Sequence, residues 1–233
     1  MPKVYITGSA GRIEGMYHQA QKETSPSVLV LHPHPLYGGT MNNKLTYGMA
    51  KQFAENDFSV LRINFRGVGN SDGKFSNGIG ELDDAGAALD WLETQNPKAS
   101  QFWISGFSFG AWIGMQLVMR RPEVDFFVVA SPPVSRYNFN FFIPCPTPGL
   151  VIQPENDEIS LPASTENLVS KVRQNGNDKI ALEMVEGASH FFQGSDQLLF
   201  DGIDACIKDS MYTRNPLKVI KYRKRQRKTQ NAS

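Results

Sequence analysis

A serine lies between two glycines in a spacing that is typical of a nucleophile. The pattern G-x-S-x-G is formed by Gly106, Ser108 and Gly110, and it stands between an apolar run and a helical pattern. Such a serine occupies a sharp turn, the nucleophile elbow, where its hydroxyl is exposed at the end of a strand and glycines relieve crowding. The chemistry indicated is attack by the Ser108 hydroxyl. The structural alternative is a serine that only caps the helix.

A serine hydroxyl needs a base to take its proton, and the base needs a group that orients it. His190 is the only histidine C-terminal to Ser108, and it directly follows the last predicted strand. Asp157 has the spacing after an earlier strand that we expect of the orienting acid. Glu155 and Glu158 in the same loop are the alternatives. We therefore predict a catalytic triad of Ser108 as nucleophile, His190 as general base and Asp157 as acid.

Acyl transfer also requires hydrogen-bond donors for the negative charge that develops on the carbonyl oxygen. The first expected donor is the backbone N–H of Phe109, directly after the nucleophile. The second is expected in the segment HPHPLYGG, whose prolines have no N–H. We favour the N–H of His34, with Leu36 and Tyr37 as alternatives.

Two other motifs suggest cofactors but lack the full pattern. His32 and His34 are two residues apart, yet no third ligand of convincing spacing accompanies them, so we expect no metal. The segment NFRGVGNSDGK lacks the glycine and hydroxyl positions of nucleotide-binding loops. We interpret it as a structural loop held by Arg66 and Ser71, and we expect no cofactor.

Residues 131–144 are rich in proline and aromatic residues. They predict a stiff apolar rim and no helical lid. Tyr137, Phe139 and Phe141 in this stretch, together with Tyr37, are candidates for a substrate pocket; covering the core is an equal alternative for the aromatic residues of the rim. An open site of this kind suits small esters or thioesters.

Short apolar segments alternating with amphipathic ones must position these residues. Strands separated by helices give a mostly parallel sheet with helices on both faces, and function then gathers at the carboxyl ends of the strands. The patterns predict an antiparallel hairpin over 4–6 and 12–19, strands over 28–32, 58–65, 102–107, 126–130, 149–153 and 180–185, helices over 42–55, 81–93, 163–174 and 196–211, and a turn followed by a helix over 106–120.

The composition indicates one domain with a tail of different character. With 233 residues, of which 40% are hydrophobic, the chain is long enough to bury one core, which we expect within residues 1–213. That part holds 16 basic against 23 acidic residues, a net charge of −7, whereas residues 214–233 hold eight basic residues and no acid. We expect this basic tail to be disordered; contact with RNA or anionic lipid is the alternative.

The remaining features concern cellular setting and partners. Cys145 and Cys206 have neither metal-like nor redox-like spacing, which favours a reducing, cytoplasmic setting. The N-terminus does not resemble an export signal, and no window approaches the roughly 20 apolar residues of a membrane span. We expect a small-molecule substrate, no membrane attachment and no nucleic-acid partner, while a monomer and a homodimer both stay open.

Five segments in chain order resemble the α/β-hydrolase superfamily. The closest resemblance is to a bacterial group of small, lidless serine hydrolases related to dienelactone hydrolases and prolyl-oligopeptidase-type enzymes, and it spans residues 4–211. The segments are HPHPLYGG, NFRGVGNSDG, GFSFGAWIG, the acid loop and GASHFF.

The resemblance implies the α/β-hydrolase fold and a serine esterase activity through an acyl-enzyme. A peptidase or aminoacyl-amide hydrolase of the same fold and a binding protein without turnover are the alternatives. Two departures matter. Gln153 and Pro154 stand where the family usually has a glycine before the acid, and serine replaces the cysteine of dienelactone hydrolases, so their substrate is not implied.

Overall fold

The apolar run after residue 26 forms a strand that is buried on both sides. In this computed structural model, which describes residues 1–213, strand β3 (Ser27–Leu31) is buried at every position. Leu29 and Leu31 belong to one hydrophobic core, whereas Val28 and Val30 belong to another. Because successive side chains of a strand point to opposite faces, a continuous apolar run is expected where both faces are covered.

β3 lies inside a sheet that is mostly parallel. Within residues 1–213 the sheet has eight strands in the order β1-β2-β4-β3-β5-β6-β7-β8. β1 pairs with β2, and β2 with β4, in antiparallel fashion, and all other pairs are parallel. The predicted fold class, including the N-terminal hairpin, is confirmed. The further strands are β1 (Lys3–Gly8), β2 (Gly11–His18), β4 (Ser59–Ile63), β5 (Phe102–Phe107), β6 (Val124–Ala130), β7 (Gly149–Asn156) and β8 (Ile180–Ser189).

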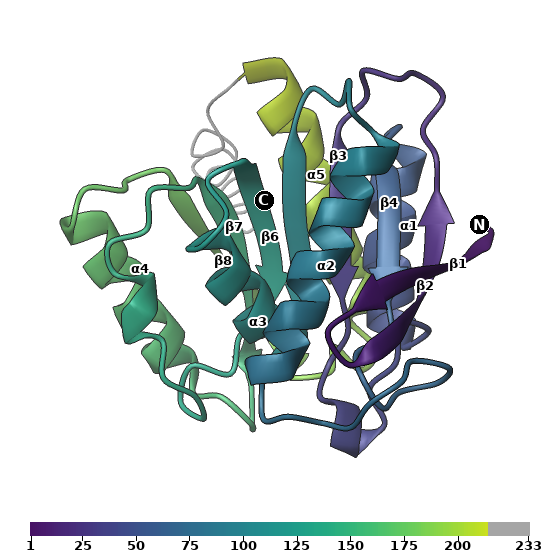
Figure 1. The fold of residues 1–233 in the computed structure, drawn as a ribbon. Coiled ribbons are helices and arrows are strands. Elements are labelled where there is room, and N and C mark those ends of the chain that lie inside the picture. Colours follow the sequence, from purple (N-terminus) through teal and green to yellow (C-terminus); the bar gives the residue numbers. More distant parts are fainter. Residues whose placement is uncertain (214–233) are drawn as a thin grey trace.

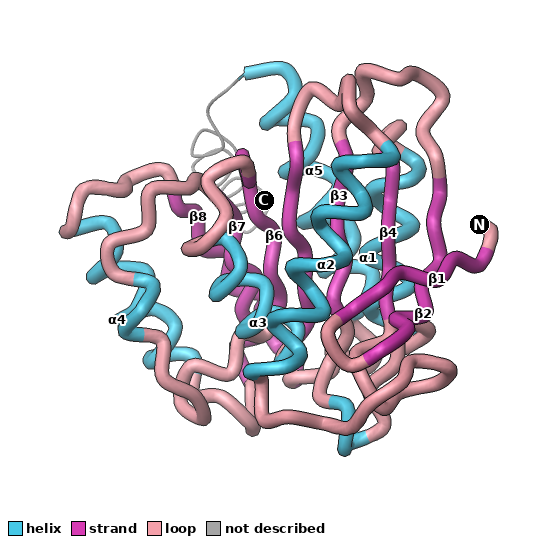
Figure 2. The backbone as a smooth tube through the Cα atoms, viewed as in Figure 1, coloured by secondary structure: helices cyan, strands magenta, loops and turns pink. Residues whose placement is uncertain are grey.

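Helices cover both faces of the sheet (Figure 1). α1 (Lys44–Glu55) and α5 (Asp196–Thr213) pack on one face and α2 (Ile79–Gln95), α3 (Phe109–Val118) and α4 (Pro162–Gln174) on the other, each set over its own core. The strands thus form a middle layer between helices (Figure 2). Two short 3₁₀ turns, η1 (Pro35–Tyr37) and η2 (Asn140–Phe142), lie in loops, and η2 is the one helical turn within residues 131–144.

The strand order changes direction at β3, and this creates room for a site. β4 pairs with one edge of β3 and β5 with the other. The helices that follow β3 and β5, α1 and α3, lie on opposite faces of the sheet. The loops after these two strands therefore diverge and leave a crevice at the carboxyl ends, which is where α/β sheets bind ligands.

Several boundaries differ from those expected. β4 ends at Ile63, two residues before its expected end, although the backbone N–H of Asn64 still donates to the carbonyl of Glu14 in β2. β7 and β8 run beyond their expected ends because they stay paired as far as Asn156 and Ser189. Of the helices within residues 1–213, none combines the length and apolar character that a membrane span requires. The basic tail predicted for residues 214–233 lies outside the described residues.

The glycine-rich loop after β4 is held by side-chain bonds at both ends. Arg66 donates from Nε and Nη2 to the two carboxylate oxygens of Asp84, at 3.0 and 2.8 Å. The Ser71 hydroxyl donates to the carbonyl of Asn64 and accepts the backbone N–H of Glu14. The loop is thereby fixed to α2 and to β2.

Glu14 is a buried carboxylate that joins the N-terminal hairpin to this loop. It accepts hydrogen bonds from the Asn64 amide and from the backbone and side chain of Asn70, all at 2.8–2.9 Å, and pairs with Lys3 at 2.7 Å. Burial alone would raise the pKa of Glu14. The donors outweigh burial and lower the pKa from 4.5 to about 2.

We predict that Glu14 makes the stability of the fold depend on pH in the acid range. Because its pKa is lower in the folded chain, its ionised form stabilises the fold above about pH 4.5, and this contribution is lost as the pH falls towards about 2. Between about pH 5 and about pH 3, the free energy of unfolding of E14Q should fall by about 2 kcal/mol less than that of the wild type. Urea unfolding at each pH measures the difference.

The matched control is E55Q, at the exposed end of α1. Its stability should follow the wild-type pH profile. An E14Q profile as steep as that of the wild type would show that Glu14 does not hold this linkage.

Candidate active site

Ser108 occupies the turn between β5 and α3 in a backbone conformation that few residues adopt. Its φ is 53° and its ψ is −116°, and a positive φ is strained for any residue with a side chain. A Cβ atom on Gly106 would collide with the carbonyl oxygen of Gly110, and one on Gly110 with that of Leu31. Both glycines are therefore required by the close approach of α3 to the sheet, as the sequence pattern predicts.

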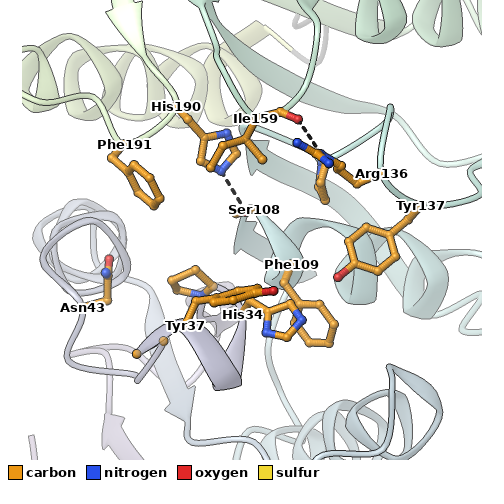
Figure 3. A pocket seen from close by; sticks show the side chains of 14 residues that line it. His34, Tyr37, Asn43, Ser108, Phe109, Arg136, Tyr137, Ile159, His190 and Phe191 are labelled. Carbon is orange, nitrogen blue, oxygen red and sulfur yellow. Dashed lines mark hydrogen bonds between the residues drawn. The ribbon is translucent and has the colours of Figure 1, made fainter.

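Three side chains from distant loops form one hydrogen-bonded line. The Nε2 atom of His190 lies 2.9 Å from the Oγ atom of Ser108 (Figure 3). On the other side of the ring, Nδ1 lies 2.9 Å from both carboxylate oxygens of Asp157. Because an ionised carboxylate only accepts hydrogen bonds, Nδ1 carries the proton and Nε2 presents its lone pair to the serine hydroxyl.

The pairing of β7 with β8 brings Asp157 and His190 together. Asn156 is opposite Ser189 in the ladder, so the next residue of each strand emerges at the same place. The two alternative acids have other partners. Glu155 accepts the backbone N–H of Gly187 at 3.0 Å, and Glu158 accepts the backbone N–H of His190 at 3.1 Å. Among the three acids of the loop, Asp157 is the one that contacts the imidazole ring.

The carboxylate of Asp157 is ionised although it is buried. Burial would raise the pKa of Asp157, but the hydrogen bond from His190 and the backbone N–H groups of Ser160 and Ile159 lower it below its usual range. The N–H distances are 2.8 and 2.9 Å. A negative charge thus stands behind the imidazole ring at neutral pH.

Gln153 is a further partner of this carboxylate, and sequence reasoning missed it. Its side-chain amide nitrogen donates to Asp157 at 3.0 Å, and its amide oxygen accepts the hydroxyl of Thr165 at 2.9 Å. Both Gln153 and Thr165 are fully buried. The ionised carboxylate of Asp157 can only accept, so the NH₂ group of Gln153 must face the acid and the amide oxygen faces the Thr165 hydroxyl, which donates to it. The sequence singled out Gln153 only as a departure from the family pattern.

Two backbone N–H groups beside Ser108, one in the loop after β3 and one at the start of α3, are free to donate. The N–H of Leu36 donates to the ring of His34, and that of Tyr37 to the carbonyl of His34. Within residues 1–213 the backbone N–H groups of His34 and Phe109 donate to no other protein group. These two residues line the same cavity as Ser108.

His32 has a structural place in this loop. One of its ring nitrogens accepts the backbone N–H of Phe65 at 3.0 Å, and the other lies 2.6 Å from the carbonyl of Pro33. Burial lowers the pKa of His32 to about 4, so the ring is neutral and both nitrogens are occupied. Among residues 1–213, no cluster of three His, Cys, Asp or Glu side chains is arranged to hold a metal ion.

A cavity of about 520 Å³ opens beside Ser108. This volume lies within the range of small-molecule sites. In Figure 3, Arg136, Ile159 and Tyr137 lie across the cavity from Tyr37 and His34, with Ser108 between the two groups. Its wall is formed by Pro33, His34, Tyr37, Gly38, Gly39, Asn43, Ser108, Phe109, Pro133, Arg136, Tyr137, Ile159, His190 and Phe191.

The structure corrects part of the expected substrate pocket. Tyr37 and Tyr137 line the cavity, and Tyr137 stacks on Trp112 with ring centroids 4.2 Å apart. Phe139 and Phe141 do not line it: their rings stack on each other, and Phe139 is 4% exposed within the core on the α2–α4 face. These two phenylalanines cover the core because the rim folds back on the sheet after Tyr137.

Arg136 belongs to the cavity wall and was also missed. It is the only charged residue in the stretch 131–144. A single cation in an otherwise apolar and prolyl rim was the signal that sequence reasoning had available.

Comparisons with known proteins show the family and the fold of this chain. Residues 17–195 match the family model of the X-Pro dipeptidyl-peptidases (S15 family), a range that contains all three residues of the hydrogen-bonded line. An uncharacterised protein of Rickettsia prowazekii is 53% identical over 197 residues, which are 83% of each chain.

Solved structures of similar chains share the architecture. A protein of unknown function from Agrobacterium tumefaciens, assigned to the α/β hydrolases, is 39% identical with a TM-score of 0.89, and the match covers 92% of this chain and 98% of that one. An α/β serine hydrolase homologue from Coxiella burnetii is 32% identical, with a TM-score of 0.78 and coverage of 87% and 95%. A lidless serine hydrolase from Xanthomonas campestris is 28% identical, with a TM-score of 0.77 and coverage of 87% and 91%.

We predict that the turn around Ser108 tolerates no side chain at Gly110. In G110A the new methyl group would press on the carbonyl oxygens of Leu31 and His32, so the free energy of unfolding should fall by about 1–3 kcal/mol. The matched variant is G86A in α2, where the nearest atom to an added Cβ is 4.0 Å away. That change should stabilise the fold by roughly 0.5–1 kcal/mol.

Urea unfolding of both variants gives the two free energies. Equal effects of the two substitutions would contradict the close approach of α3 to β3.

Proposed function

Because the chain belongs to the X-Pro dipeptidyl-peptidase (S15) family of α/β hydrolases, we propose that it is a serine hydrolase of small carboxylic esters or thioesters. The observation that carries the proposal is the continuous line from Ser108 through His190 to Asp157, with the serine facing a cavity. Such a line converts a weak nucleophile into an effective one.

The proposed reaction has two steps. The Ser108 oxygen attacks the carbonyl carbon of the ester while Nε2 of His190 takes the hydroxyl proton, and the charge of Asp157 stabilises the imidazolium. The leaving alcohol or thiol then takes that proton, and an acyl-enzyme remains. In the second step a water oxygen attacks the acyl carbon while His190 takes a proton from the water. The bond between this carbon and the Ser108 oxygen then breaks, His190 returns the proton to Ser108, and the carboxylic acid leaves.

The backbone N–H groups of Phe109 and His34 are the proposed donors to the oxyanion. Both are free of other protein partners among the described residues, whereas those of Leu36 and Tyr37 are already engaged. A donor that is fixed before the reaction stabilises the developing charge without reorganisation. The amide of Gln153 is proposed to act through Asp157, by keeping its second oxygen in place.

Hydrolysis of peptides is the second candidate, because the matching family is named for dipeptidyl-peptidases. Cleavage of a dipeptide from a free N-terminus requires the site to accept an ammonium group. The described wall of the cavity contains neither an aspartate nor a glutamate, so this cation would find no opposite charge there. The wall therefore favours esters over X-Pro peptides.

The proposed setting is the cytoplasm. Cys145 and Cys206 are both buried, and they lie in the two separate cores on opposite faces of the sheet, so they cannot form a disulfide with each other. Burial raises the pKa of Cys145 to about 11, so the thiol is protonated and unreactive. Two cysteines that lie too far apart for a disulfide with each other suit a reducing compartment.

We predict that a fluorophosphonate probe labels the wild type and does not label S108A. Hydrolysis of short p-nitrophenyl esters should fall in S108A by a factor of at least about 10³, because the nucleophile is absent. The matched control is S170A, whose serine is exposed on α4; labelling and turnover should equal those of the wild type. Gel fluorescence and absorbance of p-nitrophenolate provide the two measurements.

Two outcomes would contradict the proposal. An unlabelled wild type would favour a binding protein that has the fold without turnover. Rapid release of p-nitroaniline from an X-Pro p-nitroanilide, with no cleavage of any short ester, would favour the peptidase.

We predict that D157N retains its fold and loses most of its activity. The asparagine amide would face Nδ1 of His190 and favour the tautomer with the proton on Nε2, which can no longer accept the serine proton. A fall in kcat of about 10³–10⁴ is expected. The control is E186Q, on the exposed part of β8, with wild-type turnover. A D157N kcat within tenfold of the wild type, with thermal unfolding unchanged, would remove Asp157 from the mechanism.

A further inference from the structure

Arg136 supplies the one permanent charge in the described wall of the cavity. Of the other lining residues, His34 is neutral because burial lowers its pKa, and His190 is bonded to Asp157. The remaining residues are apolar, aromatic or uncharged. A ligand in this cavity therefore meets a positive wall at one place and an aromatic wall elsewhere.

Both the guanidinium and the backbone of Arg136 are held by backbone carbonyls. Its Nε donates to the carbonyl of Ile159 at 3.0 Å, the contact drawn in Figure 3. Its own N–H donates to the carbonyl of Pro133 at 2.9 Å. The loop is also pinned at Ser135, whose hydroxyl lies 3.2 Å from that of Ser160. Arg136 is exposed, but less conformational entropy is lost when a side chain held in this way binds a ligand than when an arginine without such a bond does.

The terminal nitrogens of Arg136 have no acidic partner in the described part of the chain. The salt bridges within residues 1–213 do not include Arg136, and Nε is the nitrogen with a protein acceptor. The acids of the loop that precedes Ile159 have other partners: Asp157 bonds to His190, Glu155 to Gly187, and Glu158 to the backbone of His190. The two terminal NH₂ groups of the planar guanidinium, with four N–H bonds, are thus left for a ligand.

We propose that the cavity selects esters that carry a carboxylate, and that Arg136 binds this carboxylate through its terminal nitrogens. This inference rests on the proposed hydrolase function and names its substrate class. A guanidinium matches a carboxylate in two parallel hydrogen bonds, which are stronger than neutral ones. The rings of Tyr37, Phe109 and Tyr137 would contact the apolar part of the substrate. Burial raises the pKa of Tyr137, so its phenol stays neutral and does not repel the anion.

The test compares matched esters in two arms, since the carboxylate belongs either to the acyl part or to the alcohol part. In the acyl arm, the p-nitrophenyl monoester of glutaric acid is compared with its methyl-capped form. In the alcohol arm, 4-acetoxybenzoate is compared with 4-acetoxybenzamide. The ratio of kcat/KM for the anionic and the neutral ester is measured for wild type, R136Q and R136K. Dividing the wild-type ratio by the variant ratio cancels the different intrinsic reactivities of the two esters.

In at least one arm, the wild-type ratio should exceed that of R136Q by roughly 10- to 100-fold. The main cause should be that R136Q has a higher KM for the anionic ester than the wild type has. R136K keeps the charge without the fork, so its ratio should lie between the two. The wild-type preference should also weaken with added salt. R120Q removes an exposed arginine outside the cavity wall and controls for the loss of one positive charge; its ratio should match the wild type.

Failure of this inference is distinguishable from failure of the proposed function. If wild type and R136Q give the same ratio in both arms while the probe still labels Ser108, the hydrolase stands and Arg136 does not select the substrate. If no ester is cleaved and no label is taken up, the proposed hydrolase function is wrong. An equal loss of the ratio in R120Q would assign the preference to overall charge.

Discussion

The hydrogen bond between His190 and Asp157 decides which nitrogen of the imidazole ring faces Ser108. A carboxylate can only accept, so the proton of the neutral ring is held on Nδ1 and the lone pair of Nε2 turns to the serine. This depends on a buried carboxylate that remains ionised. The N–H groups of Ile159 and Ser160 lower the pKa of Asp157 together with the ring itself. Two backbone bonds in one loop thus stabilise the charge that orients the proposed base.

The three side chains meet because the sheet aligns the ends of its strands. β7 and β8 stay paired through Asn156 and Ser189, and β6 spans the gap to β5. The end of β6 bonds to both sides: the carbonyl of Ala130 accepts the N–H of Ser108 at 2.9 Å, and the Ser131 hydroxyl donates to the carbonyl of His190 at 2.9 Å. The distance between serine and histidine is therefore set by contacts with the end of β6, a strand that contributes no member of the hydrogen-bonded line.

The sequence was sufficient for features that depend on chain order and local spacing. Ser108 between its glycines and His190 after the last strand could be predicted, because a sharp turn and a strand end leave local patterns. Asp157 stood among three acids, and only the β7–β8 register separates them. The position of the Gln153 side chain depends on a hydrogen bond from Thr165, which lies twelve residues away on a helix. No local sequence pattern encodes that contact. Rim aromatics raised a similar difficulty, since residue type does not reveal which rings face the cavity and which face the core.

No segment within residues 1–213 forms a lid over the cavity, so this part of the chain must recognise a substrate with groups that are already in place. The rim meets this requirement: Arg136 is tied to Ile159 and Tyr137 is stacked on Trp112. The charge of an anionic substrate also requires a group that is already in place. A substrate carboxylate near the reacting carbonyl would raise the free energy of a second negative charge on the oxyanion. Once paired with Arg136, the carboxylate is neutralised, and the oxyanion then forms in a complex whose local charge is already balanced. The arginine that selects an anionic substrate would therefore also remove the electrostatic cost that this substrate brings to the reaction.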